Sequence, residues 1–359
     1  MRMESIDKNF EVKTNIERDD LCFRDAEAEP FRIYGLIRDD DMFCRMPIHI
    51  AKKVSEGVCH ITPHTAGGRV RFITDSSYVV ISAKIQHIGK MPHFALTGSA
   101  GFDLYTDVGE GQVYRGTFIP PFDIESNTVY ESIIDLGTRE KRVVTINFPL
   151  YSSVKKLYIG LQEEAILETA PDYKYSVPIV YYGSSITQGG CASRPGNAYP
   201  TIISRMMDCD FINLGFSGNA KGEDAMTDYI NTLDMSMFVL DYDHNAPTPE
   251  HLEATHERMF QGIREKHPYL PIIMMTRPKV HLSSDEKRRV AIVERTYQNA
   301  LATGDQNVYF IKGCDLIRPD IIETATVDGV HPNDSGFVSM AYVLYSVMQK
   351  IENKMRNKL

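Results

Sequence analysis

The sequence contains no tryptophan, few cysteines and no excess of positive charge. Its 359 residues include 39 Lys and Arg against 48 Asp and Glu, giving a formal net charge of −9. Because binding to a phosphate backbone needs a basic surface, we expect no nucleic acid partner. The lack of Trp weighs mildly against a broad polysaccharide-binding platform, although the 19 Tyr could stack on sugar rings instead.

Long hydrophobic runs are also missing. Nowhere do 18 apolar residues follow one another, so we expect no membrane span. The first eight residues, Met1 to Lys8, are polar and mixed in charge and lack the apolar core of a secretory signal, which favours a cytoplasmic protein. The six cysteines form no C-x-x-C pair, a pattern typical of free thiols in a reducing compartment.

The length exceeds that of a usual single domain, so two domains with separate cores are expected. In the first part, short β-branched or aromatic runs alternate with turn residues, which predicts an all-β sandwich, specifically a jelly roll. We expect strands there at residues 69–74, 78–85, 113–118, 142–148 and 154–161.

From about residue 177 the pattern changes to strand followed by helix. This alternation predicts an α/β domain with a parallel sheet covered on both faces and a site at the carboxyl ends of the strands. We expect its strands at residues 177–182, 210–214, 235–242, 270–276 and 307–311. The domain boundary should lie within 162–176, which gives a β domain at 1–170 and an α/β domain at 171–359.

Helix-start signals support the second domain. Thr248-Pro249-Glu250 supplies an N-cap, a first-turn proline and an early acid. Ser284-Asp285-Glu286 begins another helix, and a last helix should run from near Ser335 to Lys354. The charged run Glu286 to Arg289 is interpreted as a solvated helix face.

The most informative stretch runs from Tyr181 to Gly189, where an apolar strand ends in small hydroxyl residues. Such a strand-to-helix turn lifts a hydroxyl, that of Ser185, to the edge of the sheet. Far downstream, Asp328 and His331 lie three residues apart in a turn that contains glycine. This spacing lets a carboxylate hold one imidazole nitrogen while the other faces a serine.

In these blocks the sequence resembles the SGNH or GDSL-like esterases. The first block reads Gly183-Ser184-Ser185-Ile186-Thr187, the second Asn213 to Gly218, the third Asp243-His244-Asn245-Ala246, and the last Asp328-x-x-His331. The third departs from the usual Gly-x-Asn-Asp of the family but keeps the amide. Upstream, Gly101-Phe102-Asp103-Leu104-Tyr105 matches the Gly-x-Asp-Leu-Tyr signature of a β-rich domain that precedes some of these esterases. The resemblance implies a three-layer, flavodoxin-like second domain.

The resemblance also implies the role of each site residue. Ser185 is the nucleophile, His331 the general base and Asp328 the residue that orients it. The N–H groups of Ser185 and Gly218 and the side-chain amide of Asn245 form the oxyanion hole. This hydrolysis needs no cofactor or metal ion.

Other polar residues have less certain meanings. Ser184 is expected to be a structural hydroxyl, and Asn213 either a site residue or a turn residue. His244 either lines the site or is exposed, and Arg277 either contacts substrate or pairs with an acid. The cluster from Cys59 to His64 is predicted to be loop residues of the β domain rather than a zinc site, because no second ligand pair lies nearby in sequence.

The substrate is predicted by the resemblance, because many esterases with both domains resemble carbohydrate deacetylases. It implies hydrolysis of O-acetyl esters on an oligosaccharide or another small molecule. Two other classes remain open. One is a lipase or thioesterase for longer acyl chains, and the other is a carbohydrate-binding protein with a decayed site. Oligomeric state, including a homo-oligomer, is left open.

Overall fold

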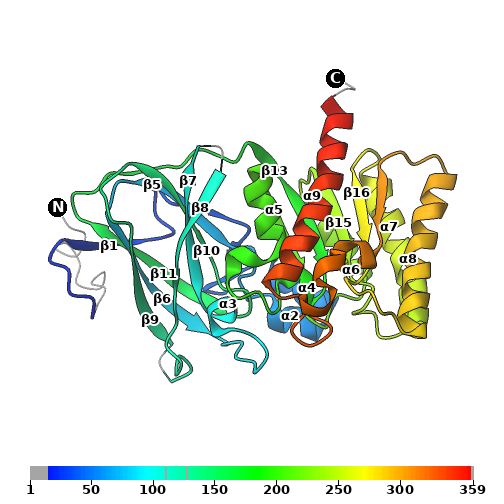
Figure 1. Cartoon of the computed structure of the whole chain (residues 1–359), viewed down its shortest axis with the longest axis horizontal. Helices are drawn as coiled ribbons and strands as arrows, with labels where there is room; N and C mark the ends of the chain where they lie inside the picture. The colour runs from blue at the N-terminus through cyan, green and yellow to red at the C-terminus, as the bar shows by residue number, and fades with distance from the viewer. Residues whose placement is uncertain (1–14, 110, 127, 357–359) are drawn as a thin grey trace.

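The computed structural model describes residues 15–109, 111–126 and 128–356, so the segment Met1 to Lys8 considered above lies outside the described residues. Figure 1 shows two halves side by side. One is rich in β-strands and ends with β12 (Leu167–Glu168), and the other alternates strands and helices from β13 (Tyr175–Gly183) onward. Within the described residues, no helix is long and apolar enough to cross a membrane.

The N-terminal half contains eleven further strands and three short helices in its described residues. The strands are β1 (Leu21–Asp25), β2 (Arg32–Tyr34), β3 (Ile37–Asp39), β4 (Met42–Cys44), β5 (Arg69–Thr74), β6 (Tyr78–Gln86), β7 (Phe102–Val108), β8 (Gly111–Phe118), β9 (Val129–Asp135), β10 (Arg142–Asn147) and β11 (Ser153–Gln162). The helices are α1 (Ile48–Val54), α2 (Glu56–Ile61) and α3 (Leu96–Ser99). All five predicted strands are present with ends that differ by two residues at most.

Two antiparallel sheets make up most of this half. Their strand orders are β1-β11-β6-β9 and β12-β5-β10-β7-β8, with β2 also paired to β5. One hydrophobic core lies between them and contains Val79 and Ile81 of the first sheet and Phe72 and Ile146 of the second. Two sheets around one core fit the predicted sandwich. The jelly-roll connection stays a prediction.

The helices α1 and α2 depart from the all-β prediction. Their buried side chains Ala51 and Val58 belong to the core of the α/β half rather than to that of the sandwich. Ser55 caps α2 by accepting a hydrogen bond from the N–H of Val58 at 3.1 Å. Cys59 and His60 therefore lie in a helix and not in the loop that we expected.

The α/β half has a parallel sheet of five strands in the order β14-β13-β15-β16-β17. Counted within this half the order is 2-1-3-4-5, the flavodoxin-like arrangement, which confirms that prediction. Besides β13, the strands are β14 (Cys209–Gly215), β15 (Met237–Asp241), β16 (Ile272–Met275) and β17 (Val308–Ile311). From β13 the chain adds β14 on one side and β15 on the other, so the topological switch point lies between β13 and β15.

Helices cover both faces of this sheet, as predicted. They are α4 (Ser185–Gln188), α5 (Tyr199–Met207), α6 (Asp224–Ile230), α7 (Pro249–Lys266), α8 (Ser284–Ala302) and α9 (Asp334–Arg356), with short 3₁₀ turns η3 (Pro195–Asn197), η4 (Gly313–Leu316) and η5 (Pro319–Thr324). Tyr181 of β13 packs with α5 and α9, while its neighbour Tyr182 packs with α6 and α7. A strand that is buried on both faces explains the unbroken apolar run before Gly183.

The predicted helix starts are also present. Thr248 caps α7, and Ser283 with Glu286 forms a capping box at the start of α8. The charged run in α8 is not wholly solvated, because Arg289 is 8% exposed and donates to the carbonyls of Asp243 and Ala246. A cation on a helix face therefore serves as a buried donor to a loop.

Two buried arginines join the halves. Arg45 donates to the carbonyls of Asn213 and Gly215, and Arg69 donates to the carbonyl of Phe211 and pairs with Asp210. All four acceptors lie on β14, the outer strand of the parallel sheet. Alternate carbonyls of an outer strand have no neighbouring strand to bond with. The two guanidinium groups donate hydrogen bonds to these carbonyls in place of a further strand.

Acid should destabilise the protein through two buried histidines, which is our first prediction. Burial lowers the pKa of His64 to about 3 and that of His256 to about 4. Their imidazoles gain protons near pH 6.5 only after unfolding, so the free energy of unfolding should fall as the pH drops from about 6.5 toward 4. Each residue should contribute about 1 kcal/mol per pH unit.

Urea denaturation at a series of pH values measures this slope. His256→Gln should flatten it, with the same change at the exposed His281 as the control for loss of a histidine. A slope that is the same in the wild type and in His256→Gln would show that His256 is not held neutral in the fold.

Candidate active site

Ser185 lies in the tight turn between β13 and α4. Gly183 ends the strand, and a Cβ there would lie 2.1 Å from Oγ1 of Thr187 and 2.3 Å from the carbonyl oxygen of Asp241. Only glycine fits so close an approach. Ser184 is the N-cap, since its Oγ accepts from the N–H of Ile186 at 3.1 Å, which confirms its structural role. Ser185 therefore begins the helix and is 8% exposed.

Asp328 and His331 lie in one turn after η5 and meet Ser185. Nε2 of His331 lies 3.0 Å from Oγ of Ser185, and Nδ1 of His331 lies 2.8 Å from Oδ2 of Asp328. Gly329 makes the turn with a φ of 78°, a conformation that favours glycine. The three predicted side chains are thus joined by hydrogen bonds in the order serine, imidazole, carboxylate.

The Asp328 carboxylate is held in its ionised form. Burial alone would raise its pKa, but hydrogen bonds from the N–H and the ring of His331, together with that from the N–H of Val330, lower it to about 2. A carboxylate that stays charged favours the imidazole tautomer with its proton on Nδ1. The lone pair on Nε2 is then directed to the Ser185 hydroxyl.

The loop after β14 carries Gly218. The carbonyl of Phe216 accepts from the N–H groups of Asn219 and Ala220, and Gly218 lies within this turn. In the described part of the chain, no hydrogen bond is found from the N–H of Gly218 or of Ser185. Asn213 is a structural residue, because its side chain donates to the carbonyl of Thr187 and accepts from the N–H of Gly215.

The loop after β15 carries Asn245 and contacts the loop that carries Gly218. The Asn245 amide donates to the carbonyl of Phe216 at 3.0 Å, so the loops after β14 and β15 are bonded together. Asn245 was predicted as an oxyanion donor, and one of its two amide hydrogens is engaged in this contact. The other hydrogen has no partner among the described residues.

Next to Asn245, a buried pair forms from Asp243 and His244. Nδ1 of His244 lies 3.0 Å from Oδ1 of Asp243, and the His244 side chain is 8% exposed, so the alternative that it is surface-exposed is wrong. Burial would raise the pKa of Asp243, but the hydrogen bonds of His244 and of the Arg277 N–H lower it below its usual value. Nε2 of His244 is buried and has no hydrogen-bond partner among the residues that the structure describes.

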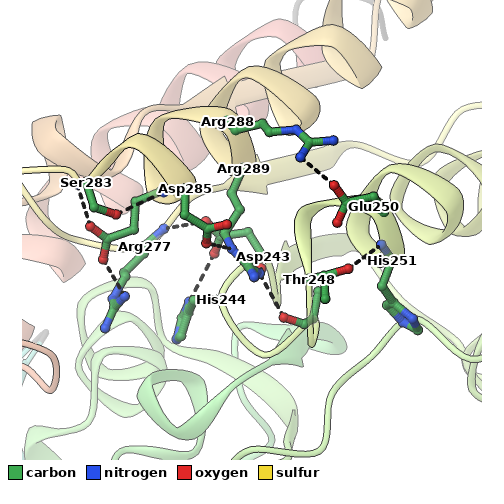
Figure 2. Close-up of polar contacts among 12 residues, drawn as sticks. Asp243, His244, Thr248, Glu250, His251, Arg277, Ser283, Asp285, Arg288 and Arg289 are labelled. Atoms are coloured by element: carbon green, nitrogen blue, oxygen red, sulfur yellow. Dashed lines mark hydrogen bonds and ion pairs between the residues drawn. The ribbon is translucent and has the colours of Figure 1, made fainter.

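Arg277 follows β16 and lies beside this pair. Figure 2 shows the side chains of His244 and Arg277 extending in the same direction. The Arg277 guanidinium donates to Glu286 at 2.7 Å, so it pairs with an acid, one of the two expected alternatives. The buried Arg289 holds the backbone of the His244 loop from the other side, as described for the fold.

Sequence reasoning missed three residues near the triad formed by Ser185, His331 and Asp328. Gln188 accepts from the N–H of Ser217 and donates to Nδ1 of His64, so it links the loop after β14 to the N-terminal half. His93, in the segment between β6 and α3, lies with its ring 5.8 Å from that of His331. Cys191 follows α4. No motif marked them, because the fold alone brings the segments before α3 and after α4 together.

Two groups of side chains within the described residues are composed and spaced as a metal site would be. They are His93, Cys191 and His331, and Asp241, Asp243 and His244. In the second group burial and the neighbouring Asp243 raise the pKa of Asp241 well above its usual value. A protonated carboxyl is a poor ligand.

Comparison with known proteins identifies the families that the two halves of the chain match. Residues 176–349 match the model of the GDSL-like lipase/acylhydrolase family, and residues 21–167 match the model of the N-terminus of SGNH-hydrolase-type esterases. The resemblance stated from the motifs is thereby confirmed. A search of curated proteins found no match.

Several solved structures share both halves of the fold. A Bacteroides ovatus protein assigned as a GDSL-like lipase is 28% identical, with a TM-score of 0.83 over 93% of this chain and 98% of that one. A salicylyl-acyltransferase from a tetracycline biosynthetic pathway is 19% identical, with a TM-score of 0.73 over 94% and 99%. A family two carbohydrate esterase from Clostridium thermocellum is 13% identical, with a TM-score of 0.61 over 90% and 98%.

Proposed function

We propose that this chain, which joins a GDSL-like lipase/acylhydrolase domain to the N-terminal domain of SGNH-type esterases, is a serine esterase that removes O-acetyl groups from carbohydrates. The family and its esterase neighbours support a carboxylic ester hydrolase. The observation that carries the mechanism is the continuous series of hydrogen bonds from Ser185 through His331 to Asp328. A decayed binding protein has no need of that series.

Catalysis begins with attack of Ser185 Oγ on the ester carbonyl while Nε2 of His331 takes the hydroxyl proton. Collapse of the tetrahedral intermediate breaks the bond to the sugar oxygen, which leaves as a hydroxyl after His331 returns the proton to it. Water then attacks the acetyl-serine with His331 as base, and acetate leaves as Ser185 regains its proton. Asp328 stabilises the imidazolium that forms in both steps.

The negative charge on the former carbonyl oxygen needs donors. The N–H groups of Ser185 and Gly218 and the free amide hydrogen of Asn245 supply them in this proposal. The loops after β14 and β15 are hydrogen-bonded to each other. Donors held by such loops need little reorganisation when negative charge develops.

The proposal of a sugar as the alcohol part of the substrate is supported by the polar side chains at this edge of the sheet. His331 protonates the leaving group, so the side chains around it face the alcohol part of the substrate. His93 is exposed there, and His244 and Arg277 follow the neighbouring strands at the same edge of the sheet. Polar and ionic side chains suit a hydroxyl-rich alcohol better than a long aliphatic chain. Among proteins of the same fold are family two carbohydrate esterases, one described in complex with cellohexaose.

Acyl-chain preference tests the substrate class and is our second prediction. Turnover should be highest on p-nitrophenyl acetate, lower on the butyrate and negligible on the octanoate, and acetate should be released from acetylated manno- or xylo-oligosaccharides. Preference for octanoate would favour the lipase or thioesterase alternative. Binding of oligosaccharide without release of acetate or p-nitrophenol would favour the decayed binding protein.

Asn245 should contribute to the oxyanion hole, which is our third prediction. Asn245→Ala should lower kcat about a hundredfold with little change in KM, because the donor acts on charge that develops only in the transition state. Asn245→Asp keeps the size but replaces a donor by a negative charge, so its loss should be larger. If both variants kept wild-type kcat with their fold intact by circular dichroism, Asn245 would serve only to hold Phe216.

A further inference from the structure

Three side chains from distant segments meet at the mouth of the active site. His93 comes from the N-terminal half, Cys191 from the loop after α4 and His331 from the turn after η5. One ligand atom of each lies within 4.8 Å of the others. His93 is exposed and His331 partly exposed, while the Cys191 side chain is buried, so an ion could enter from solvent and reach all three.

The types and spacing of these ligands suit a zinc ion. Imidazole nitrogen and cysteine sulfur bind Zn²⁺ at about 2.0 and 2.3 Å, and tetrahedral geometry then places the nitrogen and sulfur atoms of two His and one Cys roughly 3.3 to 3.6 Å apart. The cluster needs only a small closure to reach that spacing. Three protein ligands leave a fourth position for water, as in open zinc sites.

Asp328 prepares His331 for the same ion. Its carboxylate accepts from Nδ1 of His331 at 2.8 Å, the arrangement in which an outer carboxylate orients a zinc-bound histidine. With Nδ1 engaged, the nitrogen left for a metal is Nε2. In the structure that nitrogen faces Ser185 Oγ at 3.0 Å, so a metal ion and the serine hydroxyl compete for one lone pair.

We propose that His93, Cys191 and His331 form an inhibitory binding site for Zn²⁺ or a similar borderline transition-metal ion, which silences the enzyme reversibly by taking His331 away from Ser185. The binding site stands on geometry alone, and only the inhibition rests on the proposed esterase function. The N-terminal half supplies one of the three ligands, His93, and so contributes to this inhibition.

The backbone of Cys191 fits this role. Its φ of 73° is uncommon for a residue with a side chain, and such strain is found more often at functional sites than elsewhere.

Calorimetric titration of ZnCl₂ tests the site without any assay of activity. The protein is Ser185→Ala in a buffer with a non-chelating reductant, since this variant lacks the competing hydroxyl. We expect one equivalent to bind, and His93→Ala or Cys191→Ser, each made in Ser185→Ala, to weaken binding at least about tenfold. Cys191→Ala repeats the test with no oxygen at that position.

A second histidine pair provides the matched control. His60 and His87 also lie with their rings 6.3 Å apart in the N-terminal half, but no third ligand accompanies them among the described residues, so His60→Ala should leave the affinity unchanged. Absence of binding, or equal binding in the His93 and Cys191 variants, would overturn the site.

Inhibition is measured separately on the wild type. ZnCl₂ should abolish ester hydrolysis, EDTA should restore it, and His93→Ala should need at least about tenfold more zinc for half-inhibition. Wild type should bind zinc more weakly than Ser185→Ala, because its hydroxyl competes. Zinc bound at the three ligands in an enzyme that stays active would refute the inhibitory role. A protein without esterase activity that still bound zinc there would refute the proposed function and leave the site standing.

Discussion

Ser185→Ala is expected to lower kcat for ester hydrolysis by roughly 10⁵- to 10⁶-fold. In the proposed mechanism this hydroxyl forms the covalent bond to the acyl group, and no other hydroxyl is found hydrogen-bonded to Nε2 of His331 among the described residues. Residual rate above the uncatalysed one would come from the oxyanion donors and from substrate binding. Initial rates on p-nitrophenyl acetate, with product bursts recorded in the wild type, measure the loss.

The neighbouring serine offers a matched control. Ser184→Ala removes a hydroxyl of the same size one residue away, but this hydroxyl caps α4 by accepting from Ile186. Its loss should cost about 1 kcal/mol of stability and leave most of the turnover. The reverse result, with Ser185→Ala active and Ser184→Ala inactive, would move the nucleophile to Ser184 and refute the assignment.

Asp328→Asn should lower kcat about 10⁴-fold at nearly unchanged KM. The amide oxygen can still accept the N–H bonds of Val330 and His331 that shape the turn. Its amide group, however, can donate to Nδ1 of His331, which favours the tautomer whose proton points at Ser185 and leaves no base. Measuring kcat and KM for the wild type and Asp328→Asn tests this effect. Unfolding curves of the two proteins show whether the variant has kept its fold.

The stability of this variant is a check on the interpretation. The pKa of Asp328 is held at about 2, below its value in an unfolded chain, so the stability that the carboxylate contributes is present above about pH 4 and is lost as the pH falls toward 2. Asp328→Asn should therefore leave the pH dependence of unfolding above about pH 4 unchanged. A large fall in activity together with a changed slope above pH 4 would point to a disturbed turn rather than a wrong tautomer.

Local signals in the sequence were enough to predict the parallel sheet and the three side chains proposed for catalysis, those of Ser185, Asp328 and His331. The strand before Gly183 is buried on both faces and so reads as an unbroken apolar run, and Asp328 and His331 are joined within a single turn. Helix starts were equally local, since the caps at Thr248 and Ser283 depend on residues within one turn. Such features need no knowledge of distant parts of the chain.

Features that depend on tertiary contact could not be predicted. Arg289 resembles any other cation on a charged helix until Asp243 and Ala246 are placed beside it. His93 carries no motif and reaches His331 only because the N-terminal half packs against the loop after α4. The helices α1 and α2 were missed because short helices have weak periodic patterns and are stabilised by packing on the other half.

The strand β14 makes the α/β half dependent on its partner half. Its outer carbonyls are covered by Arg45 and Arg69, and α1 and α2 complete the core beneath the sheet. An α/β half cut free of these segments would present a bare sheet edge and an uncovered apolar face, both of which invite self-association. The catalytic half is therefore not a portable module that can be fused elsewhere or exchanged between chains, and the two halves must be inherited and engineered together.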